Sequence, residues 1–422
     1  MKLILIILFL NTIAFPHIKF DDYFIDKALR IDYFHTGNFE NEYYSIDELI
    51  EEPFWGGSKI NLEDKFNFGK YKVVVYDSIS NKVIYSRTYS TLFSEWQTTG
   101  EAKSTSRTFS ETVIIPYPQK SVRVEFLSRN RKNELVEKFK YQIDPNNYFI
   151  KKERTRKYSS FQVIHSGESS NKVDIVFLPE GYTQNEMETF NEDCKKFSEY
   201  SFKSSPFKEN KDKFNIWGVE AASEESGTDF PAKDIWTKTL FNTNFSTFGT
   251  ERYLMTTDNK TVRDAASNVP YDQIYILVNT KEYGGGAIYN FYSVCMNNNR
   301  FEEQVFVHEF GHGFASLADE YVTKDVSYQN FYELDVEPVD PNLTTLVDFN
   351  SKWKNLVDED TPIPTPAKDD YKSKVGAFEG GGYIANGIYR PMDDCIMRSN
   401  SAKEYCIVCR KAIQDMIDFY TE

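Results

Sequence analysis

The sequence has no excess of basic residues, since 49 Lys and Arg stand against 64 Asp and Glu, for a formal net charge of −15. Nucleic acids and anionic membranes are bound through basic surfaces that displace counterions, so this balance argues against both as partners. Long apolar runs are also missing after the first residues, and none of the later stretches is long enough for a membrane-spanning helix. We therefore expect no nucleic-acid partner and no stable membrane insertion.

Cysteine is scarce, and all five cysteines lie in the later part of the chain: Cys194, Cys295, Cys395, Cys406 and Cys409. In an oxidising compartment they permit one or two disulfides and leave at least one thiol over. The Cys406-Ile407-Val408-Cys409 spacing could form half of a structural zinc site, but the sequence has no second Cys-x-x-Cys to complete it. A structural role by packing or disulfide formation is the favoured interpretation.

The first residues resemble a secretory signal peptide. Lys2 is followed by an apolar run from Leu3 to Leu10 and then by Asn11 to Ala14 near a plausible cleavage point. We expect residues 1–16 to be removed and the protein to be secreted, periplasmic or held at the cell surface. An N-terminal lipid is not expected, because no cysteine follows the apolar run.

A chain of 422 residues exceeds what one hydrophobic core usually holds, so two domains are expected. Residues 17–147 predict an all-β sandwich. Its clearest signal is a hairpin, with strands at 71–76 and 82–86 around a polar turn, and short strands at 112–116, 122–126 and 138–143 follow. Residues 148–160 predict a linker.

The hydrophobic period changes after the linker, and residues 161–422 predict a mixed α/β domain. A nearly continuous apolar run at 172–179 indicates a buried strand, and further strands are expected at 214–219 and 273–279. Helices are expected at 185–202, from apolar residues three or four apart, and at 403–419.

The most specific motif is His308-Glu309-Phe310-Gly311-His312. On a helix, two histidines four apart project from one face and can bind a single Zn²⁺. Glu309 is then placed to act as a general base on a water molecule and to protonate a leaving amine. With only five histidines in the chain, the motif arises by chance in on the order of one sequence in a few hundred. We therefore expect a zinc metallopeptidase.

The third metal ligand is expected to be a carboxylate, because the other histidines are remote in sequence. Asp319 is the favoured candidate, with Glu320 and a more distant acid as alternatives. Seven residues of continuous helix span roughly 10 Å, so the chain has to turn after about Phe314 to bring Asp319 back to His312. The sequence has no glycine there to mark such a turn.

Three glycines, Gly284, Gly285 and Gly286, follow the strand expected at 273–279. They would let a substrate backbone approach closely if they form an edge strand beside a cleft. A plain flexible loop accounts for them equally well.

The order of elements resembles that of metzincin metallopeptidases, in which a methionine lies in a turn beneath the metal. More closely, the segments 308–321, 395–399 and 406–409 resemble the M64 peptidases, a family named for an IgA-cleaving protease. Residues 173–178, 181–183 and 225–229 also look similar to that family, and the β region resembles its N-terminal domain. The family tends to have glycines where this chain has Ala315-Ser316.

This resemblance implies a metzincin-like zinc endopeptidase that acts on protein or glycoprotein substrates. It implies His308, His312 and Asp319 as metal ligands, Glu309 as general base and Met397 below the site. Two alternatives are a binding protein with a purely structural zinc and a metal-dependent amidohydrolase. A structural zinc is normally closed by four protein ligands, and the few ligands near the motif favour an open catalytic site.

Overall fold

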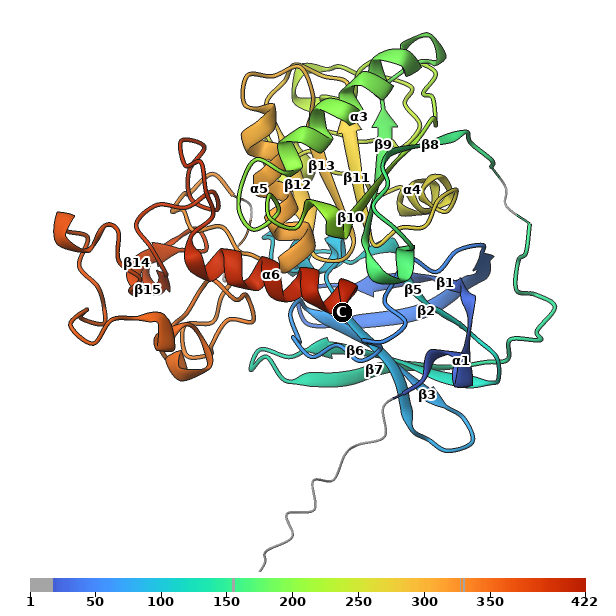
Figure 1. The fold of residues 1–422 in the computed structure, drawn as a ribbon, viewed down its shortest axis with the longest axis horizontal. Coiled ribbons are helices and arrows are strands. Elements are labelled where there is room, and N and C mark those ends of the chain that lie inside the picture. The colour runs from blue at the N-terminus through green and yellow to red at the C-terminus, as the bar shows by residue number, and fades with distance from the viewer. Residues whose placement is uncertain (1–17, 154–155, 327, 329–330) are drawn as a thin grey trace, which may run out of the picture.

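The N-terminal part of the chain folds into two antiparallel sheets that pack face to face (Figure 1). The computed structural model describes residues 18–153, 156–326, 328 and 331–422, so the expected signal peptide at 1–16 lies outside the described residues. One sheet has the order β2-β1-β5 and the other β4-β3-β6-β7. The strands are β1 (Phe24–Gly37), β2 (Glu42–Glu52), β3 (Tyr71–Asp77), β4 (Val83–Tyr89), β5 (Arg107–Pro118), β6 (Val122–Arg129) and β7 (Leu135–Ile143).

The core of this sandwich forms from the inward-facing residues of both sheets. Leu29 and Ile31 of β1 contribute from one sheet, and Val73 of β3 and Val124 of β6 contribute from the other. The expected hairpin corresponds to β3 and β4, which pair antiparallel. Two short helices, α1 (Phe20–Tyr23) and α2 (Leu92–Trp96), flank the sheets.

The C-terminal part is built on a six-stranded sheet of order β12-β13-β11-β9-β10-β8. Its four central strands are parallel and its two edge strands are antiparallel. All eight residues of β9 are buried, as its continuous apolar run predicts. The strands are β8 (Ser160–Ile164), β9 (Val173–Glu180), β10 (Phe214–Val219), β11 (Gln273–Val278), β12 (Gly285–Ile288) and β13 (Tyr292–Met296).

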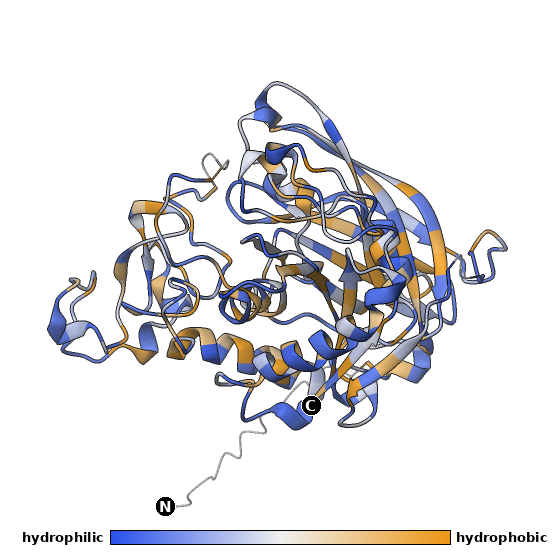
Figure 2. Ribbon diagram, turned by 90° about the horizontal axis from the view of Figure 1, so that it is seen from above, coloured by the Kyte–Doolittle hydropathy of each residue, from blue (hydrophilic) through white to orange (hydrophobic). Residues whose placement is uncertain are grey.

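Helices cover both faces of this sheet. The apolar faces of α3 (Met187–Ser201), α5 (Glu302–Ala315) and α6 (Ile407–Thr421) share one core with one face of the sheet. Helix α4 (Asn259–Ala266) packs on the other face. A lobe between α5 and α6 carries the hairpin of β14 (Phe378–Gly381) and β15 (Ile384–Arg390), coloured orange in Figure 1. In Figure 2, hydrophobic and hydrophilic residues alternate along the strands and the helices.

The two parts of the chain share a core and a buried ionic network. Leu92, Phe93 and Trp96 from the region of α2 pack in the same cluster as Val176 of β9 and Val262 of α4. The core between α4 and the six-stranded sheet therefore contains residues of both parts of the chain.

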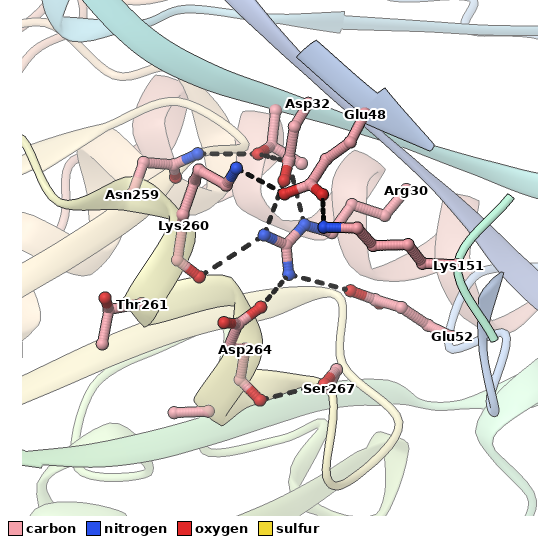
Figure 3. A network of polar contacts seen from close by, with 12 residues as sticks. Arg30, Asp32, Glu48, Glu52, Lys151, Asn259, Lys260, Thr261, Asp264 and Ser267 are labelled. Atoms are coloured by element: carbon pink, nitrogen blue, oxygen red, sulfur yellow. Dashed lines mark hydrogen bonds and ion pairs between the residues drawn. The ribbon is translucent and has the colours of Figure 1, made fainter. Parts of the chain in front are cut away.

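The ionic network centres on Arg30 of β1, whose side chain is 1 % exposed (Figure 3). Its guanidinium lies 2.7 Å from Asp32 on the same strand and 2.7 Å from Asp264 on α4. Glu52 of β2 lies 3.8 Å from the same group. These contacts attach the sandwich to α4 of the C-terminal part.

The connection between the two parts runs from the end of β7 to the start of β8. The domain boundaries given above, including the linker at 148–160, stay predictions. None of the helices among the described residues is long and apolar enough to cross a membrane.

Candidate metal centre and cleft

Helix α5 carries the paired histidines, His308 and His312, on one face. Val305, Phe306, Phe310 and Phe314 lie buried on the same helix and fix its orientation. The two histidine side chains are 15 % and 17 % exposed, and their Nε2 atoms lie 3.0 Å apart. The i, i+4 spacing therefore brings both rings to the solvent-accessible side of an otherwise buried helix.

Both histidines are oriented through their other ring nitrogen. His308 Nδ1 lies 3.0 Å from the carbonyl oxygen of Ile396, and His312 Nδ1 lies 2.5 Å from that of Leu317. A carbonyl only accepts hydrogen bonds, so both Nδ1 atoms carry the proton. In the neutral ring that a metal ion requires, Nε2 is therefore the atom that offers its lone pair.

Asp319 reaches the histidine pair because the chain turns sharply after α5. The helix ends at Ala315, and Ser316 adopts the left-handed conformation with φ 52° and ψ 33°. Asp319 Oδ1 lies 3.0 Å from His308 Nε2 and 3.4 Å from His312 Nε2. The turn that the sequence argument requires is thus made by a serine.

The three ligand atoms suit a zinc ion. Asp319 Oδ1 is buried without a hydrogen-bond partner, while Tyr383 donates to Oδ2 at 2.6 Å and orients the carboxylate. Burial raises the pKa of Asp319, but the two histidines outweigh it and hold the pKa well below its ordinary value. Two imidazoles and a carboxylate that approach within 3.0 to 3.4 Å match the donors of a three-ligand catalytic zinc site.

Glu309 lies beside this group, and the three residues line one cleft together with it. A Cβ atom placed on Gly285 of β12 would lie 3.2 Å from Glu309 Oε1, so the carboxylate faces the edge strand. Burial raises the pKa of Glu309, and the neighbouring histidines oppose the shift without cancelling it. A carboxyl group with a raised pKa is suited to exchange protons near neutral pH.

Met397 lies directly against α5. It is fully buried, and a Cβ atom on Gly311 would come within 2.8 Å of its sulfur. The backbone carbonyl of Met397 accepts a hydrogen bond from Glu320 N–H at 2.8 Å. The turn around Met397 therefore contacts both the histidine helix and the segment that carries Asp319.

The histidines open onto a cleft of about 970 Å³ between the two parts of the chain. Lys70, Glu95 and Arg129 line it from the sandwich, and His308 and His312 line it from the C-terminal part. Glu95 on α2 accepts hydrogen bonds from Tyr253 and Tyr328, the latter at 3.1 Å. Both domains therefore shape the space in which a substrate would lie.

The three glycines lie in the cleft wall, and β12 is an edge strand of the sheet. The outward backbone groups of Gly285 are already paired, since Gly285 N–H donates to Arg252 and Gly285 O accepts from Leu254. A substrate backbone would have to displace this segment to pair with Gly285. Substrate binding by Gly284, Gly285 and Gly286 stays a prediction.

Glu320, the alternative third ligand, points away from the histidines. Its Oε1 accepts hydrogen bonds from Asn342 Nδ2 at 2.9 Å and from Cys409 Sγ at 3.2 Å. The structure thus places Asp319, rather than Glu320, beside His308 and His312. The five cysteines are all buried and free, so the described residues contain none of the disulfides that the sequence permits.

Sequence reasoning missed several residues of the cleft. Tyr383 lies 64 positions from the carboxylate that it orients, and Glu95 lies in the other domain. Arg252 donates to Tyr321 at 3.1 Å, and both line the cleft. These residues are too far apart in the sequence for a short motif to predict their contacts.

Family models match both parts of the chain. A model described as IgA Peptidase M64 matches residues 161–374 and 367–417, and one described as Peptidase M64 N-terminus matches residues 19–140. No curated protein matches the chain. The matches confirm the expected organisation of an N-terminal domain followed by a peptidase domain, and they indicate peptidase activity on protein substrates. The chain belongs to the M64 peptidase family.

Proposed function

We propose that the protein is a zinc-dependent endopeptidase with a metzincin-like catalytic domain. The observation that carries the proposal is the convergence of His308 Nε2, His312 Nε2 and Asp319 Oδ1 at the wall of a cleft. These three residues would hold the ion. When bound, zinc supplies Lewis-acid chemistry that polarises a scissile carbonyl and lowers the pKa of water.

Glu309 acts as the general base and then as the general acid. Its carboxylate takes the proton of the attacking water and delivers it to the nitrogen of the leaving amine.

The open cleft argues for catalysis over a purely structural metal. Three protein ligands leave one coordination position free, whereas structural zinc sites are closed by four. The cleft gives a polypeptide access to that position. We further propose that residues 1–16 direct export, so that the substrates are extracellular or periplasmic proteins or glycoproteins.

The test is cleavage of casein, an unstructured protein, by the chain lacking residues 1–16. We expect Glu309→Gln to retain zinc and to lose about 10²- to 10⁴-fold in rate, because the proton transfers are lost. A zinc chelator should abolish cleavage by the parent chain, and added zinc should restore it.

The matched control is Glu303→Gln on the same helix, where the side chain is 36 % exposed and pairs with Lys203. It should cleave at the parent rate. Cleavage by Glu309→Gln at the parent rate would overturn the role of Glu309, and chelator-resistant cleavage would overturn the role of the metal.

A further inference from the structure

A second group of metal-binding side chains lies beneath the candidate active site. Glu320, Cys395, Cys406 and Cys409 place one ligand atom each within 4.8 Å of one another. All four residues are buried, with at most 4 % of their surface exposed. They come from three separate segments, which are the loop after α5, the turn before Met397 and the start of α6.

The distances within the group suit a tetrahedral ion. Cys395 Sγ and Cys409 Sγ lie 3.8 Å apart. A tetrahedral zinc ion with Zn–S bonds of about 2.3 Å separates two sulfur ligands by about 3.8 Å, whereas the sulfurs of a disulfide lie about 2.0 Å apart. Three thiols also cannot all pair with one another, so one disulfide would leave the third thiol without a partner.

Glu320 gives an independent indication that a cation belongs here. The residue is fully buried, and its Oε2 lacks a hydrogen-bond partner among the described residues. Among the described residues, no basic side chain forms an ion pair with Glu320, and Arg390 acts on its carboxylate only as a more distant charge. An unpaired carboxylate in the interior is costly, and buried charges are normally paired or coordinate metals.

Backbone N–H groups at the start of α6 are directed at the sulfur atoms. Cys406 N–H donates to Cys395 Sγ at 3.3 Å, and Cys409 N–H donates to Cys406 Sγ at 3.5 Å. Hydrogen bonds of this kind, with the positive end of a helix dipole, stabilise thiolates, which are the form of cysteine that binds metal.

We propose that Glu320, Cys395, Cys406 and Cys409 bind a second zinc ion in a closed structural site. Three sulfurs favour zinc over magnesium or calcium, which prefer oxygen ligands. Four protein ligands leave no position for a substrate or water, so the site supports structure and not catalysis. The proposal uses none of the ligands of the histidine site and stands independently of it.

The second ion would stabilise the segments that position the histidine site. Glu320 directly follows Asp319, and Cys395 directly precedes Ile396, whose carbonyl orients His308. Cys406 and Cys409 would attach the first turn of α6 to the same ion. One ion thus links the segments that position two of the three ligands of the histidine site.

The decisive experiment compares the zinc content of the chain lacking residues 1–16 with that of its His308→Ala/His312→Ala variant. Elemental analysis should give about two zinc ions per parent chain and about one per variant chain. Zinc-edge X-ray absorption of the variant should show sulfur ligands at about 2.3 Å. A folded variant that binds no zinc, or only zinc without sulfur ligands, would overturn the proposal.

Two cysteine variants supply the matched control. Cys406→Ser/Cys409→Ser should lose one zinc ion, and Cys194→Ser/Cys295→Ser, which changes two buried cysteines outside the group, should lose none. If Cys406→Ser/Cys409→Ser fails to fold, the zinc content of the histidine variant still tests the second site. A Cys395–Cys409 disulfide, detected by mass spectrometry of the unreduced parent chain, would contradict the second site.

Discussion

The backbone of Ser316 decides whether Asp319 can reach the histidines. Helix α5 ends one residue earlier, and the left-handed conformation of Ser316 turns the chain back toward His308. A residue with a Cβ atom adopts this conformation at a cost of about 1 to 2 kcal/mol, which glycine avoids. The backbone is therefore strained three residues before Asp319, the proposed third ligand.

This strain predicts the effect of two substitutions. Ser316→Gly should stabilise the chain by about 1 kcal/mol, because glycine adopts the left-handed conformation freely. Ser316→Val should destabilise it by more than that, because a β-branched side chain is strained at positive φ. Urea unfolding of both variants measures the changes. If Ser316→Gly destabilises the chain, the strain argument is wrong.

Local spacing predicts only part of the site at this scale. His308, Glu309 and His312 are recognisable because they lie within five consecutive residues of one helix, and helical spacing alone brings them together. Asp319 could be proposed only on the assumption of a turn that no glycine marks. Tyr383 could not be predicted, since its contact with Asp319 depends on the folded hairpin of β14 and β15.

The packing of α5 against the turn around Met397 links the helix to the geometry of the proposed metal ligands. Gly311 lies between His308 and His312 and faces the sulfur of Met397. The same turn provides the Ile396 carbonyl that orients His308. Displacement of the turn should therefore weaken the hydrogen bond that orients His308, while the His308 side chain itself stays in place.

The variant Gly311→Ala tests this coupling. Its Cβ atom would come within 2.8 Å of Met397 Sδ and 3.2 Å of the Tyr405 ring, so the Met397 side chain, or the turn that carries it, has to shift. We expect zinc affinity to fall about 10- to 100-fold, as it does when a metal ligand loses its supporting contact. Competition with a chromogenic chelator measures the affinity, and Glu303→Ala on the outer face of α5 is the control. Unchanged affinity in Gly311→Ala would refute the coupling.

The periodicity of hydrophobic residues predicts where helices and strands lie, but it does not predict which segments they pair with. The buried run at 172–179 and the helical period at 185–202 correspond to β9 and α3. In the sequence, the glycines at 284–286 fit a loop and an edge strand equally. Pairing with β13 places Gly285 and Gly286 in the strand, and Gly284 lies just before it. Likewise, the Cys-x-x-Cys of α6 finds its partners in Cys395 and Glu320, which are remote in sequence.

At the scale of the whole molecule, the sandwich is part of the cleft and not a detached module. It contributes side chains to the cleft wall, shares a core with β9 and α4, and is attached by Arg30. We expect the two domains to depend on each other for stability, because few of these contacts would survive separation.

Arg30→Ala tests this dependence. The change removes the guanidinium from Asp32 and Glu52, which are 0 % and 3 % exposed, and from Asp264 of α4 across the interface. Loss of one partner of a buried ionic network costs about 3 to 5 kcal/mol. Lys59→Ala removes an exposed pair with Asp26 and should cost less than about 1 kcal/mol. Calorimetry should show a large loss for Arg30→Ala alone, and equal effects of the two variants would contradict the interface role.

The most direct test of the zinc peptidase assignment is anomalous X-ray scattering at the zinc edge from crystals of the chain lacking residues 1–16. The account predicts a peak about 2 Å from His308 Nε2, His312 Nε2 and Asp319 Oδ1. A peak at that position would identify the metal and all three of its protein ligands in one experiment. Zinc-replete crystals without a peak there, or with Glu320 in place of Asp319, would contradict the account.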